Sequence, residues 1–161
     1  MTHNIVVGVD GSLSSFVALT AAADLAGQTS SQLAVVFVHD PGTAGALAAT
    51  YDGGAERYIE QSIAELETTS RERTFDLLAD RSLEWTFDVV GGEAVHALID
   101  VARKRGASLI VVGGRGHSVV GGLVLGSVAQ KLVRSSPISV LVVRHPAVED
   151  HQIAGQRQSA R

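Results

Sequence analysis

Residues 109–116 read Leu109-Ile-Val-Val-Gly-Gly-Arg-Gly116, an apolar run that passes directly into glycines. Three further runs share its β-branched, continuously apolar texture: Ile5-Val-Val-Gly-Val9, Leu33-Ala-Val-Val-Phe-Val38 and Val140-Leu-Val-Val143. Strands that are buried on both faces of a parallel sheet have this pattern, whereas half-buried strands alternate apolar and polar residues. The four runs therefore predict strands of a parallel sheet.

Strands and helices are expected to alternate along the chain. A fifth run, Leu83-Glu-Trp-Thr-Phe-Asp-Val-Val90, alternates more, which predicts a strand with one partly wet face near an edge. Mostly apolar residues recur at helical spacing in four stretches, and each set predicts the buried face of one helix. The four sets are Leu13, Phe16, Val17, Thr20 and Ala21; Ile59, Ile63 and Leu66; Val95, Leu98, Ile99 and Ala102; and Ala129, Leu132 and Val133. This order predicts a Rossmann-like α/β fold with a five-stranded, parallel, doubly wound sheet and helices on both faces.

The composition narrows the class of protein. The chain of 161 residues has no cysteine, which excludes disulfides, thiolate catalysis and Cys-ligated zinc and leads us to expect a cytoplasmic location. Its formal net charge of −4 provides no basic footprint for nucleic acid. The length predicts a single α/β domain over residues 1–145. The polar stretch 146–161 is expected to be a disordered tail.

Membrane and metal sites are not expected. No apolar run approaches the ~18 residues of a spanning helix. The six histidines form no His-x-His or His-x-x-x-His pair, so the sequence predicts no metal site held by side chains. The segment 41–54 is rich in small residues and is compatible with a mobile loop near a site or with a plain linker.

The segment after the fourth predicted strand is the most informative for function. It runs from Gly113 to Ser127 and is rich in glycine. Glycine lets backbone amides approach an anion, and Ser127 adds a hydroxyl at the start of the following helix. This favours a phosphate-binding loop over a merely flexible one. No lysine stands directly before Ser127, and Val119 breaks the dinucleotide fingerprint, so binding is better supported than phosphoryl transfer.

The tip of the first predicted strand is a second candidate. In doubly wound sheets, ligands bind beyond the carboxyl ends of the strands, where the winding direction reverses. Asp10 or Ser12 at this tip either caps the next helix or contributes to a site. Arg115 and His117 in the glycine-rich segment either contact phosphates or face solvent, whereas Trp85 is expected to pack in the core.

These features resemble the ATP-binding branch of the universal stress protein family. The spacing Gly113-x2-Gly116-x9-Gly126-Ser127 matches that family's G-2x-G-9x-G-(S/T) motif without a gap. The stretches 5–12, 106–117 and 136–144 are also similar to the family, and they occur in the same order. The resemblance covers about residues 4–144.

The resemblance implies that an adenine nucleotide binds at the strand tips. ATP, ADP, AMP and cyclic AMP are all candidates, with any Mg²⁺ held through the phosphates. The residues that it places around the nucleotide are Val9, Asp10, Val38, Gly113, Gly116, Gly126, Ser127 and Val128. Val9 and Asp10 would line the adenosine, the backbone of Val38 would meet the adenine edge, and the others would hold ribose and phosphates. Ala129 stands where a hydroxyl residue is common, so one contact to the distal phosphates is expected to be missing.

The resemblance also implies a homodimer. Strand 139–143 is expected at an edge of the sheet, where antiparallel pairing with a second copy would cover it; coverage within one chain is the alternative. The expected function is a nucleotide-dependent regulatory module of the stress response, with an unknown protein partner, no catalytic residue and at most slow hydrolysis. A slow Mg²⁺-dependent ATPase and a ligand-free interaction protein are the alternatives. Neither nucleic acid nor a membrane is an expected partner.

Overall fold

A computed structural model describes residues 4–39, 55–115 and 125–144, with side chains from Arg57 onward in the second range. The predicted tail 146–161, the segment 41–54, Gly116 and His117 lie outside the described residues.

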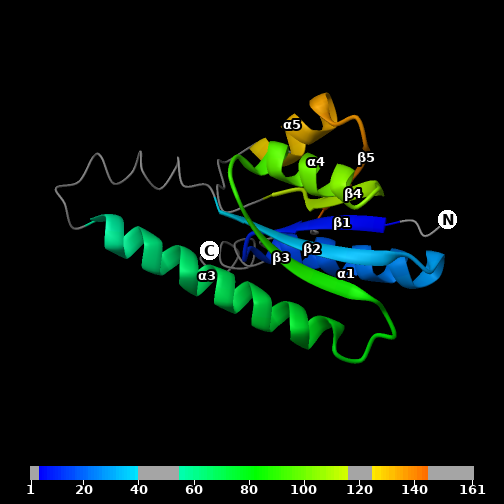
Figure 1. Ribbon diagram of the computed structural model, residues 1–161, viewed down its shortest axis with the longest axis horizontal. Coiled ribbons are helices and arrows are strands. Elements are labelled where there is room, and N and C mark those ends of the chain that lie inside the picture. The colour runs from blue at the N-terminus through cyan, green and yellow to red at the C-terminus, as the bar shows by residue number, and fades with distance from the viewer. Residues whose placement is uncertain (1–3, 40–54, 116–124, 145–161) are drawn as a thin grey trace, which may run out of the picture.

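Five strands form one parallel sheet (Figure 1). They are β1 (Asn4–Val9), β2 (Gln32–His39), β3 (Trp85–Gly91), β4 (Ala107–Gly113) and β5 (Ser139–Val143), and their order in the sheet is β3-β2-β1-β4-β5. The chain winds outward from β1 to β3 and then, in the other direction, from β4 to β5. This confirms the predicted doubly wound α/β fold, and it makes the carboxyl ends of β1 and β4 the point where the winding reverses.

Helices cover both faces of this sheet (Figure 1). Helices α1 (Leu13–Thr29) and α3 (Ala55–Leu78) lie on one face, and α4 (Ala94–Lys104) and α5 (Ser127–Ser135) lie on the other. Successive residues of β1 point to opposite faces, so Val7 packs in the core under α1 whereas Val6 packs in the core under α4. Two buried faces explain why the central strands are apolar without alternation.

The predicted face of α1 is partly wrong: Phe16 is buried as expected, whereas Val17, Thr20 and Ala21 are half-buried. Leu13 is 55% exposed, whereas Leu19, Ala22 and Ala26 are completely buried. Thr20, Asp24 and Gln28 follow one another at four-residue spacing and mark the solvent side of the helix, so its alanine-rich side is the buried one. The small alanine side chains pack against the sheet, and Leu13 remains outside in the first turn.

The predicted faces of two other helices are partly wrong. Leu66 of α3 and Val133 of α5 are 37% and 58% exposed, while Ser70 and Thr74 of α3 are completely buried. The Thr74 hydroxyl donates to the carbonyl of Ser70 at 2.7 Å, which lets this polar side chain lie on the buried side. The predicted face of α4 is confirmed, because all four of its residues are buried: Val95, Leu98, Ile99 and Ala102.

Both edge strands lie where the sequence predicts them. β3 forms one edge and has an alternating, half-exposed pattern, and β5 forms the other. Across the described ranges, every helix is too short or too polar to cross a membrane.

Candidate functional site

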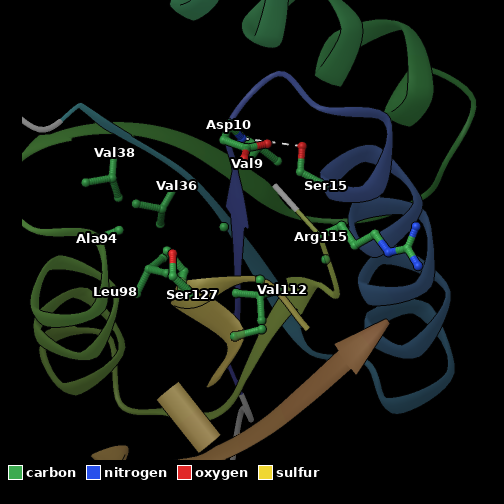
Figure 2. A pocket seen from close by; sticks show the side chains of 15 residues that line it. Val9, Asp10, Ser15, Val36, Val38, Ala94, Leu98, Val112, Arg115 and Ser127 are labelled. Atoms are coloured by element: carbon green, nitrogen blue, oxygen red, sulfur yellow. Dashed lines mark hydrogen bonds between the residues drawn. The ribbon is translucent and has the colours of Figure 1, made fainter. Parts of the chain in front are cut away.

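A cavity opens at the carboxyl ends of β1 and β4, where the winding of the sheet reverses (Figure 2). Its volume is about 280 Å³. Seven of the eight residues predicted to surround a ligand line it: Val9, Asp10, Val38, Gly113, Gly126, Ser127 and Val128. The eighth, Gly116, lies outside the described residues. The structure therefore brings together residues from β1, β2, β4 and α5.

One half of the cavity is apolar. Val36 and Val38 of β2, Val112 of β4, and Ala94 and Leu98 of α4 form this wall, and Figure 2 shows the first two beside Ala94 and Leu98. Apart from Val38, sequence reasoning missed these residues because they look like ordinary core positions. Spacing offered a signal, since Val36 and Val38 point to the same side of β2 and Ala94 and Leu98 lie one turn apart on α4. Together they form the apolar wall of the cavity, which we call the slot.

The apolar wall depends on close packing at Gly8. A Cβ atom at this position would lie 3.2 Å from Cδ1 of Leu98 and 3.5 Å from Cγ1 of Val112. Glycine thus lets the Leu98 side chain approach β1 closely.

The other half of the cavity is the amino terminus of α5. Gly126 is the N-cap residue and is extended, with no side chain to cap the helix. The first backbone bond of the helix is from Gln130 N–H to the carbonyl of Gly126 at 3.0 Å. The N–H groups of residues 127–129 therefore lack helical partners and are oriented towards the start of the helix. Such an end attracts anions, and the exposed hydroxyl of Ser127 lies beside it.

Hydrogen bonds hold the two ends of the glycine-rich segment together. The N–H of Gly126 donates to the carbonyl of Gly114 at 2.7 Å, and the N–H of Gly114 donates to the carbonyl of Val143 at 2.8 Å. The start of α5 is thereby fixed to the end of β4 and to edge strand β5.

Gly113 has a packing role that sequence reasoning missed. A Cβ atom there would lie 2.6 Å from Oγ of Ser14 and 2.7 Å from its backbone carbonyl. The same Ser14 hydroxyl accepts the N–H of Arg115 at 3.2 Å. Glycine at 113 is therefore needed for α1 to begin directly against the end of β4, whatever ligand the cavity holds.

The tip of β1 combines capping with a place in the cavity wall. Ser12 is the N-cap of α1 and accepts the N–H of Ser15 at 3.2 Å. Asp10 accepts both the hydroxyl of Ser12, at 2.6 Å, and its N–H, at 3.0 Å. Of the two readings of this tip, capping is thus performed by Ser12. Asp10 orients that cap and is also the one carboxylate among the described residues that line the cavity.

A charged cluster lies next to the cavity between α4 and α5. Glu93 is the N-cap of α4, and its Oε2 accepts the N–H groups of Val95 and His96, both at 3.1 Å. Its Oε1 faces the Lys131 ammonium at 3.4 Å, and His96 Nδ1 lies 2.9 Å from Oε2. Burial raises the pKa of Glu93, but the His96 N–H and the Lys131 ammonium outweigh this effect and hold the pKa below its ordinary value.

Arg115 lines the cavity, but Figure 2 shows its side chain extending away from Ser127 and Val38. The described ranges contain no group of three His, Cys, Asp or Glu side chains that could hold a metal ion.

Comparison with known proteins points to one group. The family model described as "Universal stress protein family" matches residues 1–144. The chain is 30% identical over 151 residues to the universal stress protein YxiE of Bacillus subtilis. The alignment covers 89% of this chain and 100% of the relative.

Solved structures agree with this match. Universal stress protein UspA from Lactobacillus plantarum superimposes with a TM-score of 0.72 at 22% identity, over 88% of this chain and 97% of the other. A universal stress protein solved in complex with cAMP has a TM-score of 0.59 at 29% identity, over 89% of this chain and 97% of the other. The first likeness supports the fold, and the second is to a protein with a cyclic nucleotide bound.

Proposed function

The chain belongs to the universal stress protein family, and we propose that it binds an adenine nucleotide, ATP first among the candidates, in the cavity at the ends of β1 and β4. One observation carries this proposal: a single cavity joins an apolar slot to an uncapped helix amino terminus. A nucleotide combines a flat aromatic base with anionic phosphates, so one molecule matches both halves. The likeness to a family member solved with cAMP supports the same ligand class.

The residues divide between the two parts of the ligand. The adenine would lie in the slot formed by the valines of β2 and by Leu98, and the backbone of Val38 would bind its edge. Val9 and Asp10 would line the adenosine, and Gly113 and Gly116 would hold ribose and phosphates as the family motif implies. Gly126, Ser127 and Val128 would bind phosphate through the start of α5.

A nucleotide-bound Mg²⁺ would be held mainly by the phosphates. Asp10 is the one carboxylate in the described lining, and its Oδ1 already accepts two hydrogen bonds from Ser12. This arrangement does not favour a strong general base, so we expect at most slow hydrolysis and assign no catalytic residue. In this proposal the nucleotide acts as a signal, and a protein partner senses whether the cavity is occupied.

The proposed role is a cytoplasmic regulatory module of the stress response with a protein partner. We further propose a homodimer that pairs strand 139–143 with its copy, since β5 is an edge strand and Leu141 on it is 38% exposed. Dimerisation through this strand would leave the cavity wall intact, because the lining residues lie on β1, β2, β4, α1, α4 and α5 and on the segments that join them.

The first experiment is to denature the purified protein, identify any released nucleotide by mass spectrometry, and titrate ATP, ADP, AMP, cAMP and adenosine by calorimetry. Ser127→Ala removes one phosphate contact. It should lower the affinity for ATP about fivefold and leave the affinity for adenosine unchanged. Ser135→Ala, at the other end of α5, is the matched control. Val38→Phe fills the slot and should weaken adenosine and ATP alike.

The opposite result is equally clear. If no nucleotide is released, and millimolar nucleotide changes neither the heat of titration nor the melting temperature, the cavity is not a nucleotide site. The ligand-free interaction protein would then be the better account of this chain.

A further inference from the structure

Lys131 lies on α5 one turn after Ser127, on the same side of the helix. Side chains of a helix tilt towards its amino terminus, so the lysine stem leads back towards the first turn. Its ammonium lies 3.4 Å from Oε1 of Glu93, the residue directly before Ala94 of the cavity wall. The side chain of Lys131 therefore reaches from α5 to the residue that caps α4. It runs along the start of α5, which is where phosphates are proposed to bind.

We propose that Lys131 is a phosphate-binding residue and that Glu93 competes with the nucleotide's phosphates for its ammonium. This inference rests on the proposed nucleotide site and adds to it the cation that distinguishes charged from uncharged ligands. Without phosphate, Lys131 pairs with Glu93. With phosphate at the start of α5, the ammonium turns to the ligand and leaves the carboxylate.

The pair with Glu93 is suited to exchange. It is long, at 3.4 Å, and the two side chains are 65% and 39% exposed for Lys131 and Glu93. Exposed ion pairs of this kind contribute little, whereas an ammonium gains more from a phosphate with several anionic oxygens. The lysine stem is flexible, so the head can turn about its last bonds without movement of the helix.

Glu93 can lose the lysine without becoming unpaired. Its Oε2 accepts two backbone N–H groups of α4, and His96 Nδ1 lies 2.9 Å from the same oxygen. Lys131 is the cation that faces Glu93 from α5 in the described structure, and His96 faces it from α4. Arg115, the cation in the described lining of the cavity, extends away from Ser127 (Figure 2), and Arg144 lies beside Gly114. Among the described cations, Lys131 is the one that lies one turn after Ser127 on α5 and reaches across to the start of α4.

The test compares nucleotides that differ only in phosphate charge. Calorimetric titrations with ATP, AMP and adenosine would be made on wild type, Lys131→Gln, Glu93→Gln and the double variant. Lys131→Gln should lower the affinity for ATP about tenfold and the affinity for AMP by less, and it should leave the affinity for adenosine unchanged. Glu93→Gln should raise the affinity for ATP about threefold, because the lysine no longer pairs with a carboxylate. In the double variant, ATP affinity should match that of Lys131→Gln, since Glu93 acts through the lysine.

Lys104→Gln, in the last turn of α4, is the matched control for loss of one lysine charge, and Lys131→Arg should retain most of the affinity. Equal ATP affinity in wild type and Lys131→Gln would overturn the inference, as would an equal loss for adenosine. Wild-type protein that binds none of the three ligands would instead overturn the proposed function itself, and this inference with it.

Discussion

Gly113 and Ser14 are in such close contact that a Cβ atom on Gly113 would lie 2.6 Å from the Ser14 hydroxyl oxygen. The contact joins the end of β4 to the first turn of α1, and the same hydroxyl accepts the N–H of Arg115. Both elements border the cavity. The packing of the scaffold and the shape of the site therefore depend on the same glycine.

Gly113→Ala should destabilise the fold by about 1–3 kcal/mol, because the added methyl overlaps backbone atoms of Ser14 that cannot turn aside. Urea unfolding followed by circular dichroism measures this change. Gly27→Ala is the matched control, since Gly27 lies in α1 with nothing within 4 Å of its Cβ position, and this variant should gain about 0.5–1 kcal/mol. Unchanged stability in Gly113→Ala would show that α1 adjusts freely, contrary to the packing described.

The capping carboxylate Glu93 predicts a pH dependence of stability. Its pKa is lowered in the folded protein, so its stabilising contribution is present above the unfolded-state pKa and is lost as pH falls through the folded-state pKa. Glu93→Gln should reduce the free energy of unfolding by about 0.3–1 kcal/mol at pH 7, because a negative charge is lost at a helix amino terminus.

The difference in the free energy of unfolding between wild type and Glu93→Gln should shrink as pH falls below the unfolded-state pKa of the glutamate, and it should vanish once the wild-type carboxyl is protonated in the folded protein. Urea titrations at several pH values between 3 and 7, on the order of one unit apart, give both curves. Glu60→Gln, an exposed glutamate of α3, controls for the loss of one negative charge. A difference that stays constant down to the lowest pH would contradict the role assigned to the carboxylate charge.

The parallel sheet was predictable because strands buried on both faces have a distinctive texture, visible at Val6 and Val7. The start of α5 was predictable because Gly126 and Ser127 stand at motif spacing. Ala94 and Leu98 were not, since their one-turn spacing on α4 is shared with ordinary core positions and does not by itself reveal which residues meet a cavity. The contact of Glu93 with Lys131 joins residues 38 positions apart, so no local pattern predicts it.

Edge strand β5 provides a test of the proposed dimer. Leu141→Asp places a negative charge on the strand that would pair with its copy. A two-fold interface contains the substitution twice, so the dimer would bring two such charges into the same interface. The dissociation constant of the dimer should rise about tenfold or more, measured by analytical ultracentrifugation. Val89→Asp on the opposite edge strand β3 is a close control, because Val89 is 37% exposed and Leu141 38%. If Val89→Asp dissociates the dimer and Leu141→Asp does not, the interface lies at the other edge.

Lysine acylation offers a direct view of the proposed phosphate contact, because the sequence has just two lysines, Lys104 and Lys131. An amine that is bound to phosphate stays protonated and shielded, and only the neutral amine reacts with an acylating reagent. ATP at saturating concentration should therefore slow acylation of Lys131, measured peptide by peptide by mass spectrometry, and leave Lys104 unchanged. Adenosine occupies the same slot without phosphates and should protect neither lysine. Equal protection by adenosine and ATP would mean that the ligand shields Lys131 by closing the cavity and not through its phosphates.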